Sequence, residues 1–111
     1  MPFLTIYSNG VGSNPNLAAE AAELVAKELG KPLQYVVVNV LMNPAMAFNG
    51  NAKNKGALIE MKSIGFRNKA ALCKVLTDFA VANLNVERRY VNIQFVDMPA
   101  DTVAVGGMLL G

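Results

Sequence analysis

An internal repeat is the feature that most limits how this chain can fold. When residues 2–45 are laid without gaps on residues 57–100, eight positions are identical. The identical pairs are Ser8/Ser63, Gly10/Gly65, Leu17/Leu72, Leu29/Leu84, Tyr35/Tyr90, Val36/Val91, Pro44/Pro99 and Ala45/Ala100. Both copies also read as a strand, a helix and a second strand, so they share a structural pattern as well as identities. The repeat therefore predicts two β-α-β units inside a single domain of residues 1–111, because halves of about 50 residues are too small to be separate domains.

The individual elements are predicted by apolar spacing and by turn residues. In the first copy we expect a strand over 3–8, then a helix with Asn14 as its N-cap and Pro15 in its first position. Gly30 stands where a C-terminal cap of this helix belongs. The remaining predicted elements are a strand over 35–42, a loop over 43–56, a strand over 57–63, a helix over about 68–84, a strand over 90–96 and an apolar tail over 97–111 with a short strand around 102–105.

The order of these elements predicts an α/β fold with one uncovered face. Each β-α-β unit places its strands parallel with a right-handed crossover, and two such units related by a pseudo-twofold axis give a four-stranded mixed sheet with two helices on one face. The strand over 35–42 is apolar at nearly every position, which is typical of burial on both faces. Only 16% of the residues are charged, against about 25% in an average soluble domain. We therefore expect another copy of the chain to cover the open face.

Charge and hydropathy exclude several classes of partner. The net charge of +2 is spread along the chain without a basic stripe, so we expect no nucleic-acid partner. No apolar run approaches the ~18 residues of a membrane span, and no basic segment leads into an apolar run at the start, so we expect neither a membrane partner nor a signal peptide. The single cysteine, Cys73, fits a reducing compartment. We expect a cytoplasmic protein in which this thiol is buried.

Missing residue types narrow the chemistry further. The chain has no histidine and no second cysteine, which excludes the usual zinc ligand sets and the Ser-His and Cys-His nucleophile pairs. It also has no glycine-rich phosphate loop, since Gly10–Val11–Gly12 lacks the rest of such a motif. We expect neither a metal nor another cofactor. An enzyme of this composition must take its acid–base groups from carboxylates, lysines, tyrosines or the chain terminus.

Among these groups, the terminal amine needs the smallest pKa shift to act near neutral pH. An α-amine starts at a pKa of roughly 7.7–8.0, whereas lysines start near about 10.4 and carboxylates near about 4. Removal of Met1, which the small Pro2 favours, would leave Pro2 as a secondary amine at the head of the first strand. Burial and a nearby cation would lower its pKa further. Pro2 is therefore a candidate general base, and the alternative is a Met-Pro start without a catalytic role.

Five segments, in order, carry a family resemblance. They are Pro2 after Met1, Gly30-Lys31-Pro32-x-Gln34-Tyr35-Val36, Met46-Ala47-Phe48-x-Gly50, Ser63-Ile64-Gly65 and Asp97-Met98. Together they resemble the macrophage migration inhibitory factor family of the tautomerase superfamily over almost the whole chain. The resemblance implies a homotrimer with an active site at each subunit interface. It also implies a tautomerase in which Pro2 moves a proton between carbon and oxygen of an α-keto acid, usually phenylpyruvate or hydroxyphenylpyruvate.

The resemblance also implies roles for single residues. Lys31 is expected to bind the substrate carboxylate and to help keep Pro2 neutral; the alternative is a lysine that caps the first helix. Ile64 is expected to offer its backbone N–H to the same carboxylate, with Ser63 beside it in the site. Tyr35 either lines the site entrance or packs on the sheet.

Two site positions on the last strand depart from the family pattern. Counted back from Asp97–Met98, Asn92 stands where many members have a pocket tyrosine, and Gln94 replaces a site asparagine. A shifted alignment would equate Tyr90 and Asn92 with that tyrosine and asparagine. The repeat argues against the shift, because it pairs Tyr90 with Tyr35.

The tail departs from the pattern at one position and keeps it at another. Val103 fits an apolar pocket position, whereas Val105 stands where a tryptophan is common. Asn92 and Val105 thus replace two aromatic side chains of the family pattern, and aromatic rings stabilise a bound ring beyond the area that they bury. We expect activity that is weaker toward aromatic keto acids or tuned to a different side chain.

Two other classes of function compete with this enzyme. The family includes secreted, cytokine-like members, so a signalling or binding protein with weak or vestigial catalysis is the main alternative. Dehalogenation or hydration of small unsaturated acids ranks last. Superfamily members with those activities usually add an arginine or a carboxylate pair near the proline, and the strands over 3–8 and 35–42 offer no such pair.

Overall fold

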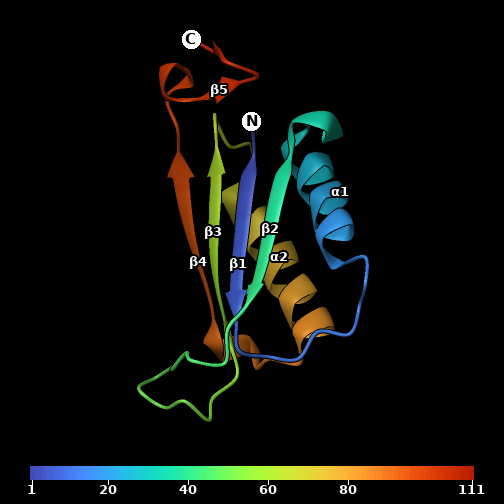
Figure 1. Ribbon diagram of the computed structural model, residues 1–111, viewed down its shortest axis with the longest axis vertical. Helices are drawn as coiled ribbons and strands as arrows, with labels where there is room; N and C mark the ends of the chain where they lie inside the picture. The colour runs from blue at the N-terminus through green and yellow to red at the C-terminus, as the bar shows by residue number, and fades with distance from the viewer.

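The computed structural model describes residues 1–111 and places four strands in one mixed sheet (Figure 1). The strands are β1 (Phe3–Ser8), β2 (Val37–Met42), β3 (Ala57–Ser63) and β4 (Val91–Asp97). Their order is β2-β1-β3-β4, with β1 parallel to β2, β3 parallel to β4, and β1 antiparallel to β3 at the centre. This is the mixed sheet of two β-α-β units that the repeat predicts, and the predicted fold class is confirmed.

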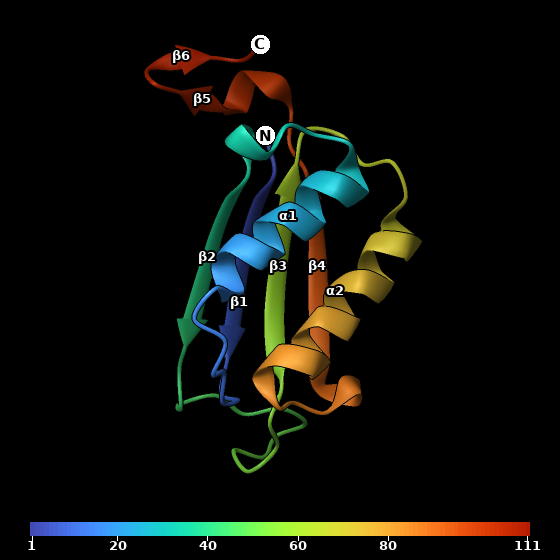
Figure 2. The same ribbon diagram turned by 90° about the vertical axis from the view of Figure 1, so that its right-hand side faces the viewer.

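Two helices, α1 (Leu17–Leu29) and α2 (Lys69–Leu84), cover one face of the sheet (Figure 2). Each helix buries one stripe of apolar residues spaced four apart, as an amphipathic helix does. The buried residues are Leu17, Ala21, Val25 and Leu29 in α1 and Leu72, Leu76, Ala80 and Leu84 in α2. They pack on Leu4, Ile6, Ala57, Ile59 and Met61 from the two central strands. The core therefore lies between the helices and the middle of the sheet.

The predicted start of α1 is wrong by two residues. The helix begins at Leu17, after Asn16, whose side chain makes no capping hydrogen bond. Asn14 instead closes a turn ahead of the helix, because its Oδ1 accepts a hydrogen bond from the Asn16 N–H at 2.9 Å. The predicted C-terminal cap is confirmed: Gly30 adopts the left-handed conformation at φ 63°, and its repeat counterpart Asn85 ends α2 at φ 53°.

The strand predicted over 35–42 differs from its prediction in two ways. A short 3-10 helix, η1 (Leu33–Tyr35), takes up its start, so β2 begins at Val37. β2 is also an edge strand in which no residue is fully buried: Val38 and Val40 pack partly on the core, while Val37 is 54% exposed. Burial on both faces is therefore wrong for the single chain, because only one face of β2 lies under a helix.

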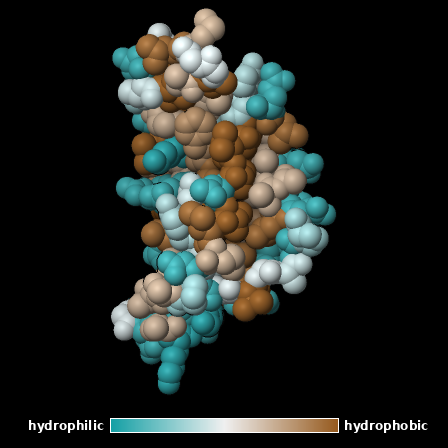
Figure 3. Space-filling model, in the orientation of Figure 1, coloured by the Kyte–Doolittle hydropathy of each residue, from teal (hydrophilic) through white to brown (hydrophobic).

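The face of the sheet away from the helices is open and carries exposed apolar side chains. Val37, Leu41 and Leu58 on this face are each more than 40% exposed. They alternate along β2 and β3 with residues that face the helices. Figure 3 shows apolar side chains gathered over the middle of the sheet. Exposed apolar side chains on such a face, set among polar ones such as Asn39 and Lys62, are typical of a surface that another protein covers, as the low charge content of the sequence also indicates.

The C-terminal tail folds into a small hairpin beyond the sheet. After η2 (Arg88–Tyr90) and β4, the chain forms η3 (Ala100–Thr102), then β5 (Ala104–Val105) paired antiparallel with β6 (Met108–Leu109). The short strand predicted around 102–105 is thus present as β5, and the sequence analysis missed its partner. Figure 1 shows the hairpin at the same end of the sheet as the start of the chain. None of the helices has the length and apolarity that a membrane crossing requires.

The single thiol is on the surface, and its predicted burial is wrong. Cys73 is exposed on α2, although it directly follows the buried Leu72. One residue along a helix rotates the side chain by about 100°, which turns Cys73 away from the sheet. Its repeat counterpart Ala18 is exposed on α1 in the same way.

Candidate active site

The chain begins at one end of the sheet, across from the end of β3. β1 and β3 pair with Phe3 opposite Lys62, so one further step of the antiparallel register places Pro2 opposite Ser63. The Pro2 ring is fully buried, and its carbonyl oxygen accepts a hydrogen bond from the Val37 N–H at 3.0 Å. The Pro2 nitrogen is therefore held at a fixed place by pairing on both sides of β1.

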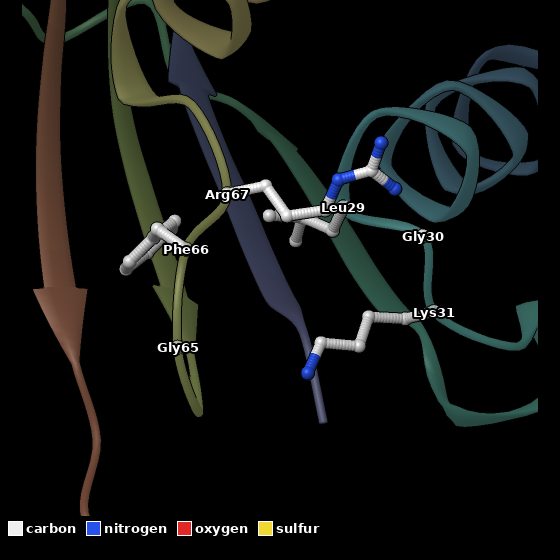
Figure 4. A pocket seen from close by; sticks show the side chains of 6 residues that line it. All are labelled: Leu29, Gly30, Lys31, Gly65, Phe66 and Arg67. Atoms are coloured by element: carbon white, nitrogen blue, oxygen red, sulfur yellow. The ribbon is translucent and has the colours of Figure 1, made fainter.

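Lys31 reaches this end of the sheet from the end of α1. Its backbone N–H donates to the Ala26 carbonyl oxygen at 3.0 Å, just beyond the left-handed Gly30. Its Nζ donates a hydrogen bond to the Ile64 carbonyl oxygen at 3.1 Å and to no carbonyl of α1. Figure 4 shows the ammonium pointing toward the start of β1. The Lys31 backbone thus helps to close the C-terminus of α1, while its side chain is directed to the loop after β3.

The electrostatics of this end favour a neutral terminal amine. Burial lowers the pKa of the amine, carried here by Met1, and the positive charge of Lys31 lowers that pKa further. Lys31 has no carboxylate partner that would cancel its charge, since all ion pairs in the chain lie elsewhere. They are Lys74–Asp78, Arg88–Asp78 and Arg89–Glu87.

The loop after β3 presents a free backbone donor beside the lysine. The Ile64 N–H makes no hydrogen bond within the chain, whereas the next N–H, that of Gly65, donates to Asp97 Oδ1 at 2.9 Å. An ammonium and a free N–H side by side suit a carboxylate, because charge-assisted hydrogen bonds are the stronger kind. The arrangement is able to hold a small carboxylic acid next to an amine that exchanges a proton near neutral pH.

A hollow of about 290 Å³ lies beside Lys31, between the end of α1 and the loop after β3. Its lining residues are Leu29, Gly30, Lys31, Gly65, Phe66 and Arg67. Figure 4 shows Arg67 turned toward Gly30 and away from the Lys31 ammonium. A Cβ on Gly30 would collide with this guanidinium. Arg67 is a cation that the sequence analysis missed, and its only signal in the sequence is its place three residues after Ile64.

Other predicted site residues lie away from Pro2 in the single chain. Asn92 and Gln94 are exposed on the open face of β4. Asn92 lies five residues before Asp97, which pairs with Ser63, so it is about 16 Å down the strand from the level of Pro2. Only a second chain packed on the open face would bring these amides to a Pro2 nitrogen.

Tyr35 and Val103 occupy two further places. Tyr35 ends η1 just before β2, and it is 41% exposed. Val103 is buried inside the C-terminal tail, where its carbonyl oxygen accepts a hydrogen bond from the Leu110 N–H at 2.9 Å. Tyr35 thus remains available at the surface, whereas the Val103 side chain is already covered within its own chain.

The structure supports the ungapped alignment of the last strand. Tyr35 and Tyr90 each end a 3-10 helix that leads into a strand, so the repeat pairs them in space as it does in sequence. Tyr90 packs near Phe48 of the loop over 43–56, with ring centroids 6.5 Å apart, at the end of the sheet opposite to Pro2. Tyr90 and Asn92 both lie away from the Pro2 of their own chain, so the ungapped alignment rests on the pairing of Tyr90 with Tyr35 in the repeat.

Comparisons with known proteins agree over nearly the whole chain. The family model described as macrophage migration inhibitory factor (MIF) matches residues 1–111. A macrophage migration inhibitory factor homolog of Brugia malayi is 35% identical over 121 aligned residues that cover 100% of both chains. The macrophage migration inhibitory factor of Oncomelania hupensis has a TM-score of 0.92 at 23% identity, over 100% of this chain and 83% of that chain. The Q0 fused 4-OT wild type symmetric trimer has a TM-score of 0.83 at 21% identity, over 97% of this chain and 94% of that chain.

Proposed function

We propose, from the premise that this chain belongs to the macrophage migration inhibitory factor family of the tautomerase superfamily, that it is a keto–enol tautomerase of phenylpyruvate-like α-keto acids. The observation that carries the proposal is the terminal amine, whose pKa is lowered by burial and by Lys31. In a chain without histidine, no other group starts as close to neutral pH. That amine belongs to Met1; removal of Met1 frees the Pro2 nitrogen, until then an amide, as the new terminal secondary amine, which we propose experiences the same burial and the same charge.

The proposed reaction moves one proton from carbon to oxygen. Lys31 and the Ile64 N–H hold the substrate carboxylate, which places the carbon next to the keto group beside the Pro2 nitrogen. This nitrogen takes a proton from that carbon, and the electron pair of the broken C–H bond forms the C=C bond of the enol. The keto oxygen then takes up a proton from the Pro2 ammonium or from water. Such general base catalysis contributes about 100-fold to 10,000-fold.

The side chain of the preferred substrate is a separate question from the reaction. Phenylpyruvate-like acids follow from the family, yet Asn92 and Val105 stand where aromatic pocket residues are common among its members. An amide and a small aliphatic side chain stack weakly on a phenyl ring. We therefore propose weaker binding of aromatic keto acids than is usual for the family, and we expect an aliphatic α-keto acid of similar length to compete well.

The complete site is proposed to form in a homotrimer. The apolar open face of the sheet supports this, and so does the trimeric state named for the fused 4-OT of the same fold. Packing on that face would carry Asn92 and Gln94 of one chain to the Pro2 end of another. Sedimentation should give three times the chain mass, and Leu58→Glu, which places a charge on the open face, should give monomers without activity. A monomeric wild-type protein would contradict the proposal.

The amine itself is tested by variants of its own residue. Intact mass first establishes that Met1 is absent. Pro2→Gly keeps a terminal amine but loses the ring that fixes it, so it should lower kcat/KM by about 100-fold in an enol–keto absorbance assay. Equal, background-level rates for the wild type and Pro2→Gly would contradict the enzyme and leave the cytokine-like binding protein as the better hypothesis.

A further inference from the structure

One buried hydroxyl group lies next to Pro2 without a hydrogen-bond partner. Ser63 is fully buried at the end of β3, and its Oγ is the only buried side-chain polar atom in the chain that makes no hydrogen bond. The register places Ser63 opposite Pro2, and both residues face the helices, as their neighbours Leu4 and Met61 do. A buried hydroxyl group without a hydrogen-bond partner destabilises the fold, so its presence needs a reason.

The repeat shows what such a serine does when its partners are present. Ser8 is the counterpart of Ser63, and its Oγ donates to the Gly56 carbonyl oxygen at 2.7 Å. The same oxygen accepts a hydrogen bond from the Gly10 N–H at 3.0 Å. Gly56 directly precedes Ala57, the residue that pairs with Ser8 across the sheet. In this half of the repeat, Ser8 at the end of β1 binds the residue that leads into β3.

Neither of these partners binds Ser63. The counterpart of Gly56 is Met1, whose carbonyl oxygen makes no hydrogen bond with Ser63 Oγ and which the proposed processing removes. The counterpart of Gly10 is Gly65, whose N–H donates to Asp97 instead. In the mature chain, the polar group that takes the place of the incoming peptide is the Pro2 nitrogen itself.

We propose that Ser63 positions the catalytic amine by accepting a hydrogen bond from the Pro2 N–H. A neutral secondary amine has one N–H and one lone pair. An N–H held by Ser63 Oγ leaves the lone pair with one direction, toward the substrate carbon beside Lys31. This inference rests on the proposed function, since it needs the free Pro2 amine, and it gives Ser63 a positioning role without contact with the reacting carbon.

The charged groups around this end do not take the same role. Lys31 donates to the Ile64 carbonyl oxygen, and Asp97 accepts from Gly65. Lys62 precedes Ser63 and is exposed on the opposite face of β3. Arg67 turns toward Gly30 (Figure 4). Of these charges, only that of Lys31 lowers the pKa of the terminal amine, and Ser63 is the buried side chain that is free to fix the direction of the amine.

The matched variants are Ser63→Ala and Ser8→Ala. Each removes one oxygen atom from an equivalent place in the repeat, and Ser63→Ala removes an atom that no other group needs, so the fold is retained. The direct readout is the ¹⁵N signal of Pro2 in protein labelled with ¹⁵N-proline. Pro2 is the only one of the five prolines with an amine nitrogen, and its titration gives the amine pKa without any turnover.

Opposite outcomes are expected for the two serines. A hydroxyl holds a protonated amine more strongly than a neutral one, so Ser63→Ala should lower the pKa of Pro2 by about half to one unit. It should also reduce kcat about tenfold, with the melting temperature unchanged. Ser8→Ala should lower the melting temperature by about 5 °C or more, with the Pro2 titration unchanged.

Failure of this inference is distinct from failure of the proposed function. An unchanged Pro2 titration in Ser63→Ala overturns the positioning role, whatever the activity of the enzyme. The Pro2 titration could shift in Ser63→Ala while the wild type and Pro2→Gly have equally low rates. That result supports the role of Ser63 and contradicts the proposed tautomerase activity. A chain that keeps Met1 overturns both, because Ser63 then faces an amide nitrogen without an N–H.

Discussion

The two ends of the central strands, which the repeat makes equivalent, differ in how tightly they are closed. Where β1 ends, the Gly10 backbone lies directly on α2, and the Val11 N–H donates to the Leu84 carbonyl oxygen at 2.9 Å. Where β3 ends, a Cβ on Gly65 would meet nothing within 4 Å; hollows of about 290 Å³ lie at both ends, so the ends differ in how closely the glycine backbone is packed. The same sequence pattern therefore builds one closed end and one open end.

The residues before the two central strands differ between the ends. At the closed end, the Gly56 N–H donates to the Asn9 side chain at 2.9 Å. At the open end, the counterpart of Gly56 is Met1. Two further residues differ between the ends. Ile64 stands at the repeat position of Asn9, and Lys31 stands at the repeat position of the buried Val86. The repeat supplies a rigid scaffold, and the candidate site lies where its symmetry is broken.

The largest expected effect is a difference in stability loss between alanine variants of Gly10 and Gly65, the two equivalent glycines of the repeat. A Cβ at Gly10 would overlap the Leu84 carbonyl oxygen and come within 2.7 Å of a Val86 methyl group, so Gly10→Ala should lower the free energy of unfolding by about 3 kcal/mol. Gly65→Ala meets no atom, and its cost is the strain of φ 83°, about 1 kcal/mol. Chemical denaturation measures both. Equal losses would show that the two ends are equally closed.

The next effect concerns the side chain that anchors the closed end. Asn9 accepts from the Gly56 N–H and donates to the Asn54 carbonyl oxygen, both at 2.9 Å. Asn9→Ala leaves the buried Gly56 N–H without a partner, so we expect a loss of about 2 kcal/mol in denaturation. The control is Ile64→Val at the open end, which should cost about 1 kcal/mol or less. A larger loss in the control would reverse the assignment of the anchored end.

The sequence predicted the scaffold better than the site, for a physical reason. Strand and helix positions follow from local spacing of apolar residues, and the pairing of Gly30 with Asn85 shows that even caps repeat. The start of α1 was missed because Asn14 is equally able to cap a helix or to close a turn. The exposure of Cys73 was missed because a residue beside a buried leucine gives no sign of its direction around the helix.

The site depends on contacts between distant segments, which a linear pattern does not encode. Pro2, Lys31 and Ile64 were identified through their order along the chain and the family resemblance. Their meeting at one end of the sheet needed the register of β1 and β3. Arg67 was not predicted, because its place depends on the contact of its guanidinium with the left-handed Gly30, which is distant in the sequence. The unpartnered hydroxyl of Ser63 becomes meaningful only beside its counterpart Ser8, whose hydrogen bonds are complete.

A third variant tests the electrostatics of the open end. Lys31→Gln removes the charge that lowers the amine pKa, so that pKa should rise. Because only the neutral amine is a base, the rising limb of kcat/KM against pH should move to higher pH. Loss of the ammonium should also raise KM for an α-keto acid about tenfold. Lys55→Gln, in the hollow beside the closed end, is the control, and an equal change in both variants would contradict a local role for Lys31.

The smallest expected effect concerns the loop that carries the free Ile64 N–H. The Gly65 N–H is held by Asp97 Oδ1, so Asp97→Ala should let this loop move and misalign the neighbouring donor. The hydrogen bond is exposed, so we expect a loss of stability below about 1 kcal/mol and a rise in KM of about threefold, with kcat nearly unchanged. Asp101→Ala in η3 is the control. If Asp97→Ala lowers kcat and leaves KM unchanged, the loop acts on the amine rather than on the substrate carboxylate. Lys31 would then bind the carboxylate without help from the Ile64 N–H.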